Sequence, residues 1–357
     1  MELSEYINIS QYSIPQQDKN THIIDLLNKL HLHHLSCSDE YRKISKYIFN
    51  VTGKVSKTED LPFLPVSIFK KRALKSIADD KVFKVLTSSG TTGSIPSRIF
   101  LDTETAQLQT LALSKIITHI LGQQRLPMLI VDSKSVLTDR TSFSARGAGI
   151  LGLSVFGKNH QYMLDDNYEI DYKSFNTFID RFNGQQMLIF GFTFMIWKYL
   201  FLNKFDKNID LSNAVLIHSG GWKKLQEQQV DNATFKQKLF EKFGLKKAFN
   251  FYGMVEQVGS IFIENSDGYL HCPNFSDIII RDPKDFSVLP VGNEGLVQVV
   301  SVLPKSYPGH SLLTEDIGVC VGEDNSSNGW KGRYFKIIGR AKKADLRGCS
   351  DTFASNN

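Results

Sequence analysis

The sequence predicts a layered α/β protein with a separate strand-rich portion, and three observations support this prediction. Four short apolar runs have the length and composition of buried strands: MLIVD (128–132), MLIF (187–190), AVLIH (214–218) and AFNFY (248–252). Helical patterns lie between some of them, for example over 223–243, as expected when helices connect the strands of a largely parallel sheet. From Ser260 onward strands and turns alternate, which indicates a β-rich portion.

The remaining segments fit this scheme in chain order. The first eighty residues carry short apolar stripes typical of helices, interrupted by the proline-containing loop EDLPFLPVSIFKK (59–71). Residues 105–121 repeat apolar side chains at helical spacing. The most apolar stretch, 187–202, is short for a membrane span and contains Lys198, so it is predicted to be buried core.

Composition narrows the function classes. A chain of 357 residues with 41% apolar and 22% charged residues can bury a large core without a metal or a disulfide. Lys and Arg exceed Asp and Glu by 42 − 37 = 5, and no basic stripe of the nucleic-acid-binding kind is present. The cysteines are scattered without a CxxC pair and the N-terminus is polar, so we expect a reducing, cytoplasmic location with no signal peptide and no membrane span.

The run HLHHLSC (31–37) could place His33 and Cys37 on one helix face, where a metal could bind. No second cluster completes four ligands, so a structural role is favoured.

The run TSSGTTG (87–93) combines hydroxyl side chains with glycines that allow a sharp turn. Its candidate ligand-binding residues are Ser88, Ser89, Gly90, Thr91, Thr92 and Gly93. Backbone N–H groups in such a turn can point at one anion, which predicts a phosphate-binding loop; the alternative is a plain surface loop. A Walker loop is excluded, because it would need Gly at Ile95 and Lys at Pro96.

Four further motifs follow in order: HSGGW (218–222), FYGMVE (251–256), LTEDIG (313–318) and GR (339–340). Together with the Ser/Thr/Gly run, this series resembles the adenylate-forming superfamily of acyl-CoA synthetases, luciferases and peptide-synthetase adenylation domains. The strings SGGWKK (219–224) and RGCSD (347–351) and the short length resemble a narrower branch, the acyl-protein synthetases that activate fatty acids in bacterial luminescence-type systems. The resemblance covers roughly residues 20 to 352.

The resemblance implies a domain organisation. A large N-terminal adenylate-forming domain, with layered αβαβα sheets and a β-rich subdomain, is expected over 1–338. A hinge and a short C-terminal tail are expected over 339–357, with the small C-terminal domain of the superfamily largely absent.

The resemblance also implies an ATP site. The Ser/Thr/Gly run would bind the β- and γ-phosphates, with Arg98 supplying charge where many relatives carry a lysine. Glu256 would hold Mg²⁺ against the phosphates, since carboxylate oxygen is a ligand that Mg²⁺ prefers. The bland alternative for Glu256 is a solvated carboxylate at a strand end.

Adenine and ribose complete this site. The backbone at Gly220 and Gly221, with the neighbouring Trp222, would approach the base. Tyr252, followed by Gly253, would stack on the base, although it could instead be a core tyrosine before a turn. The two carboxylate oxygens of Asp316 suit the two ribose hydroxyls.

The end of the chain carries the predicted acyl acceptor. Cys349 lies near Lys342, Lys343 and Arg347, and positive neighbours favour the nucleophilic thiolate. Arg340 is expected at the hinge near the ribose or phosphate. Lys342 or Lys343 could replace the catalytic lysine of the small domain, or adenylation could proceed without it, or a partner could complete the site.

The resemblance therefore implies an AMP-forming acyl-protein synthetase that uses ATP and Mg²⁺. It would adenylate a carboxylic acid, expected to be a fatty acid, pass the acyl group to Cys349 and then to a nicotinamide-dependent acyl reductase. Two alternatives stay open: an acyl- or aryl-CoA ligase of the phenylacetate type, and a non-catalytic nucleotide-binding subunit of a reductase complex.

Overall fold

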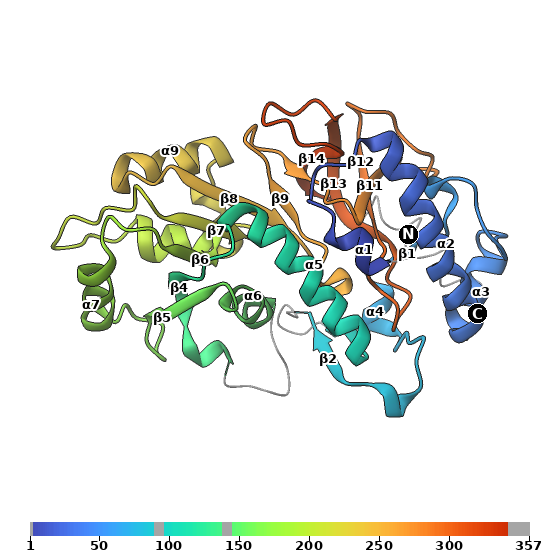
Figure 1. The fold of residues 1–357 in the computed structure, drawn as a ribbon, viewed down its shortest axis with the longest axis horizontal. Helices are drawn as coiled ribbons and strands as arrows, with labels where there is room; N and C mark the ends of the chain where they lie inside the picture. The colour runs from blue at the N-terminus through green and yellow to red at the C-terminus, as the bar shows by residue number, and fades with distance from the viewer. Residues whose placement is uncertain (1–2, 89–95, 138–144, 342–357) are drawn as a thin grey trace. The chain divides into compact units, whose positions relative to one another are not determined.

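The computed structural model describes residues 3–88, 96–137 and 145–341. The chain forms two compact units (Figure 1): 117–252, here the parallel-sheet unit, and 1–116 with 253–357, here the antiparallel-sheet unit. The predicted α/β class is confirmed. The predicted boundary at 339 does not coincide with this division and stays a prediction.

The parallel-sheet unit contains five parallel strands in the order β5-β4-β6-β7-β8. Their bounds are β4 (Leu126–Ser133), β5 (Gly157–Leu164), β6 (Leu188–Phe192), β7 (Val215–Ser219) and β8 (Lys247–Tyr252). All four apolar runs are confirmed as strands, and three of them are buried as predicted. The run AFNFY in β8 is buried only at Ala248 and half-buried from Phe249 onward, so that part of the prediction is wrong. Because parallel strands end at a common edge, the motifs HSGGW and FYGMVE both begin at the carboxyl edge of this sheet, with Ser219 paired to Phe251.

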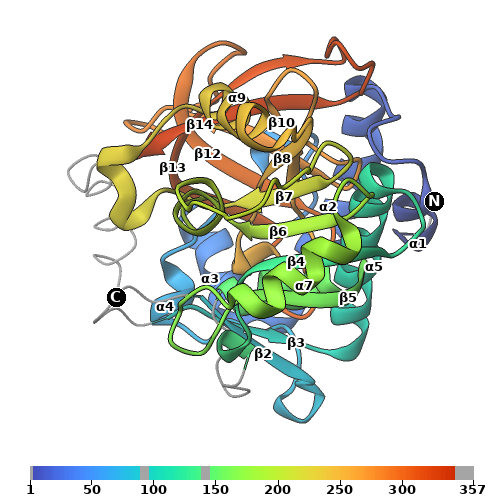
Figure 2. The same cartoon turned by 90° about the vertical axis from the view of Figure 1, so that its left-hand side faces the viewer.

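Helices of this unit pack against its sheet, as Figure 2 shows for the helix beside β5. They are α6 (Ala145–Ser154), α7 (Tyr172–Phe182), α8 (Thr193–Met195), the π-helix η4 (Ile196–Phe201), the 3₁₀-helix η5 (Lys223–Gln228) and α9 (Asn232–Phe243). The helix predicted over 223–243 is in fact η5 followed by α9. The reason is local: the Asp231 side chain accepts a hydrogen bond from Thr234 N at 2.8 Å and so starts a new helix there.

The antiparallel-sheet unit contains strands in the order β11-β12-β13-β14-β10-β9 and a separate β2–β3 hairpin. Their bounds are β2 (Lys84–Thr87), β3 (Arg98–Leu101), β9 (Phe262–Glu264), β10 (Leu270–His271), β11 (Ser276–Arg281), β12 (Glu294–Ser301), β13 (Ser311–Glu323) and β14 (Arg333–Arg340). A short strand, β1 (Leu64–Pro65), pairs in parallel with β13. The strand-rich texture after Ser260 is thus confirmed.

The helical elements of this unit come mainly from the first part of the chain. They are α1 (Leu3–Asn8), α2 (Gln16–Cys37), α3 (Asp39–Tyr47), η1 (Thr58–Asp60), α4 (Ile68–Lys71), η2 (Asp79–Lys81), α5 (Thr103–Leu121) and η6 (Val255–Gln257). The helix predicted over 105–121 is α5, in which the boundary between the units falls. None of the helices in the described ranges is both long and apolar enough to cross a bilayer.

A buried charge network anchors α2 to the antiparallel sheet. The ammonium of Lys19 lies 3.8 Å from Asp277, Arg333 lies 3.6 Å from the same carboxylate, and the Gln16 amide donates to it at 2.6 Å. Burial raises the pKa of Asp277, but the Lys19 and Arg333 charges outweigh it and hold this pKa below its usual value. The carboxylate therefore stays ionised and holds two cations inside the fold.

Two histidines of HLHHLSC, His31 and His34, lie in a second buried cluster, whereas His33 is half-buried and lies 3.8 Å from Cys37 Sγ. His31 Nδ1 is 2.7 Å from the Tyr41 hydroxyl, which is also 3.1 Å from His310 Nε2. His34 contacts Ser76 Oγ at 2.7 Å and the Pro304 carbonyl at 3.0 Å. Burial lowers the pKa of His31 to about 4 and of His34 to about 3, so these rings are neutral and link α2 to distant loops.

Candidate functional site

Glu256 lies in η6, just after the FYGMV string, and only 8% of its surface is exposed. The hydroxyl of buried Tyr307 donates to its backbone carbonyl at 2.9 Å, which fixes this turn. The pKa of the Glu256 carboxyl is raised, chiefly by burial. The nearby Glu315 carboxylate also raises this pKa, whereas the Ser97 hydroxyl and the Lys70 charge lower it. Two carboxylates, a hydroxyl and a lysine thus share one region of the antiparallel-sheet unit.

The β2–β3 hairpin carries the predicted phosphate-binding run. Ser88 N donates to the Ser97 carbonyl at 3.2 Å, and Ser97 N donates to the Ser88 hydroxyl at 2.8 Å. Ser88 therefore closes the base of this run, a structural contact that sequence reasoning did not predict. The other predicted phosphate ligands lie outside the described residues: Ser89, Gly90, Thr91, Thr92 and Gly93.

Strand alternation in β3 separates Ser97 from Arg98. Ser97 is fully buried and acts on Glu256, whereas Arg98 is exposed and lies with its guanidinium 6.0 Å from the Phe100 ring. Successive side chains of a strand point to opposite faces. The structure therefore brings Ser97, which sequence reasoning missed, to Glu256 and leaves Arg98 on the other face.

The predicted ribose and hinge residues meet directly. Asp316 on β13 is the register partner of Arg340 on β14, and their side chains approach to 3.5 Å. The Asp316 carboxylate is 19% exposed and the Arg340 side chain 78% exposed, so a ligand could displace the guanidinium at small cost. Thr314 Oγ1 accepts from Asp316 N at 3.1 Å and holds this part of β13 in place.

Gly220 follows β7 with a φ of +82°, a conformation that side chains with a Cβ rarely adopt. A Cβ at Gly220 would also lie 2.9 Å from Phe192, whereas a Cβ at Gly221 would meet nothing within 4 Å. Trp222 turns into the core, edge-on to Trp197 at 5.0 Å between ring centroids. The backbone conformation at position 220 therefore requires glycine. The predicted contact of Trp222 with the nucleotide stays a prediction.

His218 supports the backbone just before these glycines. The Thr193 hydroxyl donates to the Ser219 carbonyl at 3.2 Å, so it accepts from His218 Nδ1, 3.0 Å away. Burial lowers the pKa of His218 to about 3, so the ring is neutral. Sequence reasoning missed this pair, because the pairing of β6 with β7 is what brings Thr193, the residue after β6, to His218.

The remaining predicted site residues lie either at the end of β8 or outside the described residues. Tyr252 is half-buried at the end of β8, and Gly253 follows it. Cys349, Lys342 and Lys343 lie outside the described residues. Among the cysteines that the structure describes, burial raises the pKa of the Cys320 thiol to about 11 and that of Cys272 well above its usual value, which makes both poor nucleophiles.

Mg²⁺ at a phosphate site commonly uses one or two carboxylates together with phosphate oxygens. Glu256 offers a buried hard-oxygen ligand, with the Glu315 carboxylate in electrostatic range. In the described ranges no three or more His, Cys, Asp or Glu side chains are grouped to hold an ion by themselves. The donor set therefore fits a metal that arrives with the nucleotide.

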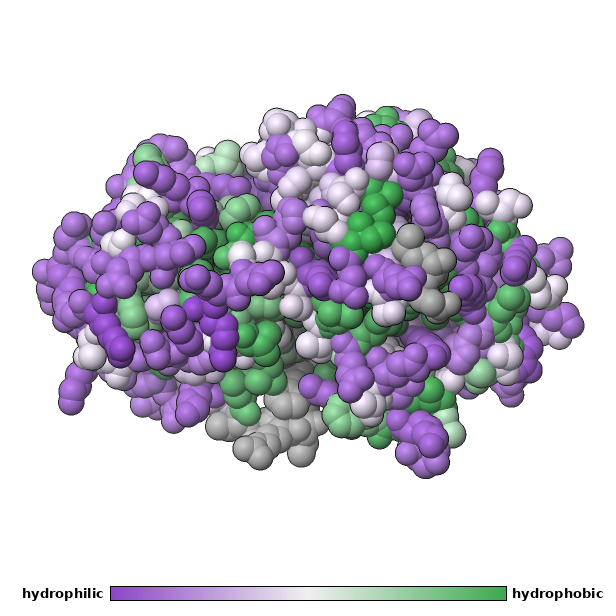
Figure 3. Space-filling view, viewed as in Figure 1, coloured by the Kyte–Doolittle hydropathy of each residue, from purple (hydrophilic) through white to green (hydrophobic). Residues whose placement is uncertain are grey.

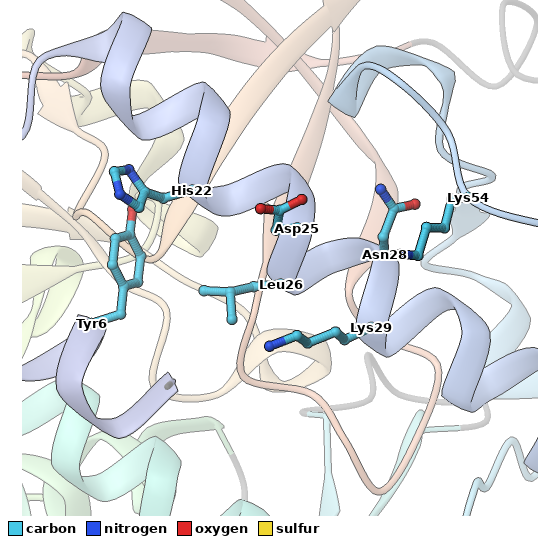
Figure 4. A pocket seen from close by; sticks show the side chains of 7 residues that line it. All are labelled: Tyr6, His22, Asp25, Leu26, Asn28, Lys29 and Lys54. Carbon is cyan, nitrogen blue, oxygen red and sulfur yellow. The ribbon is translucent and has the colours of Figure 1, made fainter. Parts of the chain in front are cut away.

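A surface pocket of about 300 Å³ lies elsewhere, along α2 (Figure 4). It is lined by Tyr6, His22, Asp25, Leu26, Asn28, Lys29 and Lys54. The Asn28 amide is already paired with the backbone of Val55 in both directions, at 2.9 Å each. The pocket shares no residue with the candidate site. Hydrophilic side chains predominate on the face of the molecule in Figure 3.

The fold is that of adenylate-forming ligases. An open conformation of 2-hydroxyisobutyryl-CoA ligase, in complex with 2-HIB-AMP and CoA, superposes with a TM-score of 0.66 at 14% identity, over 92% of this chain and 76% of that chain. The postadenylation state of the same ligase, in complex with 2-HIB-AMP, gives a TM-score of 0.68 at 14% identity, over 92% and 69%.

The family follows from sequence. The model of the family "Acyl-protein synthetase, LuxE" matches residues 9–356, so the chain belongs to this family and is a ligase. It is 26% identical to a long-chain-fatty-acid–luciferin-component ligase of Vibrio harveyi, over 97% of this chain and 92% of that protein. A ligase of the same name from Aliivibrio fischeri is 24% identical, over 90% and 85%.

Proposed function

We propose that this chain is an AMP-forming acyl-protein synthetase that activates a long-chain fatty acid with ATP and Mg²⁺. The observation that carries this proposal is the family match over residues 9–356, and the names of the Vibrio harveyi and Aliivibrio fischeri relatives support the fatty acid. The scattered cysteines support a cytoplasmic location.

The proposed first step joins the acid to AMP. An oxygen of the substrate carboxylate attacks the α-phosphorus of ATP, the bond to the β-phosphate breaks, and pyrophosphate leaves with the electron pair. Asp316 accepts hydrogen bonds from the ribose hydroxyls, and Arg340, its partner at 3.5 Å, moves to the phosphate side. Glu256 holds Mg²⁺, which neutralises phosphate charge when bound.

The proposed second step moves the acyl group to sulfur. The Cys349 thiolate attacks the acyl carbonyl, AMP leaves, and a thioester remains on the chain. A reductase partner then accepts the acyl group. Cys272 and Cys320 are unsuited to this step, because their buried thiols have raised pKa values.

The test separates the two steps. Acid-dependent exchange of labelled pyrophosphate into ATP should persist in Cys349→Ser, while ATP-dependent labelling of the protein by fatty acid should disappear. Cys37→Ser, which changes an exposed cysteine, is the matched control and should keep both activities. Asp316→Asn should lower the exchange.

Other outcomes would point to the alternatives. Release of acyl-CoA on addition of coenzyme A, with Cys349 dispensable, would indicate an acyl-CoA ligase. Binding of ATP without acid-dependent exchange, even with the reductase present, would indicate a non-catalytic subunit.

A further inference from the structure

The site needs a cation that the phosphate-binding run does not provide. Glu256 and Glu315 already place two carboxylates in one region, and a nucleotide polyphosphate would add further negative charge. The residues that follow the run are Pro96, Ser97 and Arg98, and Arg98 lies beside Phe100 on the face opposite to Ser97. The role of Arg98 stays a prediction, and a cation on another element can add to the compensating charge.

Strand pairing brings α4 to this region. Pro65 of β1 pairs with Leu313 of β13, and Val66 N donates to the Leu313 carbonyl at 3.0 Å. Since β1 runs parallel to β13, α4 begins where β13 continues into Glu315 and Asp316. Contacts between α4 and β3 place the helix beside the hairpin strand that follows the run.

A chain of packed side chains fixes the orientation of α4. Phe69 is buried and packs edge-on against Tyr307, with 6.1 Å between ring centroids. The Tyr307 hydroxyl donates to the Glu256 carbonyl at 2.9 Å. The next residue, Lys70, is exposed and lies near enough to Glu256 for its charge to act on that carboxylate.

Lys70 is available for a ligand. Its ammonium forms no hydrogen bond or ion pair with any residue in the described ranges, although Glu256 lies within electrostatic reach. A lysine acts as a point charge toward phosphate and can contact several oxygens in turn. Lys71, the next residue, is also exposed and is not among the largest influences on the pKa of Glu256, so the two lysines form a natural comparison.

We propose that Lys70 binds the polyphosphate of the nucleotide beside Glu256 and takes the place of the lysine that the sequence lacks after the Ser/Thr/Gly run. This proposal rests on the proposed function. It adds a phosphate-binding residue from α4 and requires no chemistry beyond the adenylation step. The ammonium contacts the β- or γ-phosphate oxygens in the bound state and stabilises pyrophosphate as it leaves.

The experiment compares Lys70→Ala, Lys70→Arg and the matched control Lys71→Ala. The first readout is calorimetric affinity for MgATP and for magnesium pyrophosphate in the absence of fatty acid. Lys70→Ala should weaken both by about 10- to 100-fold, the range for losing one charge-assisted hydrogen bond. Lys70→Arg should restore most of the affinity, and Lys71→Ala should stay within about 2-fold of the unmodified protein.

The second readout is acid-dependent pyrophosphate exchange, in which Lys70→Ala should raise the KM for ATP and lower kcat. Equal effects of Lys70→Ala and Lys71→Ala on affinity would overturn the proposal, as would failure of the unmodified protein to bind either ligand. If the unmodified protein binds MgATP but shows no acid-dependent exchange, the proposed function fails, while the affinity comparison still decides the role of Lys70. Thermal unfolding of each variant verifies that these exposed substitutions leave the fold intact.

Discussion

Acidification from pH 7.5 to 5.5 should destabilise the antiparallel-sheet unit far more than the parallel-sheet unit. Burial lowers the pKa of His31 and His271 to about 4, that of His34 to about 3, and that of His310 well below its usual value. All four belong to the antiparallel-sheet unit. The other unit contains His218, with a pKa of about 3, and His119, whose pKa burial also lowers. Because the fold favours the neutral form of these rings, the same histidines bind protons at a higher pH in the unfolded chain than in the folded protein.

The sign and size follow from this difference in proton binding. A histidine with an unfolded pKa of 6.5 that stays neutral in the fold contributes full stability above that pH and loses it as the pH falls. At pH 5.5 the loss is about 1.4 kcal/mol for each such ring. Four rings give about 6 kcal/mol in the antiparallel-sheet unit. In the other unit His218 gives about 1.4 kcal/mol, and His119 adds a smaller share because it is exposed. Typical domain stabilities are about 5–15 kcal/mol.

Hydrogen exchange read by mass spectrometry at the two pH values, corrected for intrinsic rates, measures this difference peptide by peptide. Protection should fall mainly in peptides from α2, β10 and the loop before β13. In urea titrations, the free energy of unfolding of His34→Gln should depend less steeply on pH than that of the unmodified protein. The difference should correspond to one proton fewer taken up on unfolding. Equal loss of protection in both units, or an unfolding free energy that differs by less than about 1 kcal/mol between the two pH values, would refute the reasoning.

Two further substitutions test the packing. Gly220→Ala forces a Cβ into a left-handed backbone position 2.9 Å from Phe192, so it should lower the free energy of unfolding in urea by about 2 kcal/mol or more. Gly221→Ala has open space around its Cβ and should change that free energy by less than about 0.5 kcal/mol. Asp277→Ala leaves the buried Lys19 without its carboxylate and removes one of the two ion-pair partners of the half-buried Arg333, so it should cost about 3–5 kcal/mol. Glu104→Gln, which removes the exposed partner of Lys305, should cost less than about 1 kcal/mol. Near-equal costs within either pair would count against these accounts.

The strands could be predicted because their signal is local. A run such as AVLIH is almost wholly apolar, and a strand buried on both faces requires that composition. The break between η5 and α9 differs from the single predicted helix, because the apolar pattern over 223–243 continues through Asp231 although its carboxylate caps α9. The partners of His34 could not be predicted, since Pro304 is 270 residues away and only the fold brings it there.

Some residues of the candidate site also have a local sequence signal, whereas others depend on the fold. Asp316 and Arg340 were found from short motifs, and the structure makes them register partners on adjacent strands. Ser97 could have been found from strand alternation, because Arg98 and Phe100 must share a face that Ser97 does not. Lys70 has no local signal, since its place beside Glu256 depends on the pairing of β1 with β13.

The two units contribute different kinds of groups to the proposed chemistry. In the parallel-sheet unit the contribution is shape: a glycine with positive φ, and a neutral His218 that holds the preceding backbone through Thr193. In the antiparallel-sheet unit the contribution is charge, from Glu256, Asp316 and Lys70. Electrostatic effects on polyphosphate binding weaken with added salt, whereas a steric requirement at a glycine does not. Defects of charge-changing variants in the antiparallel-sheet unit should therefore diminish at high ionic strength, while the defect of Gly220→Ala should persist.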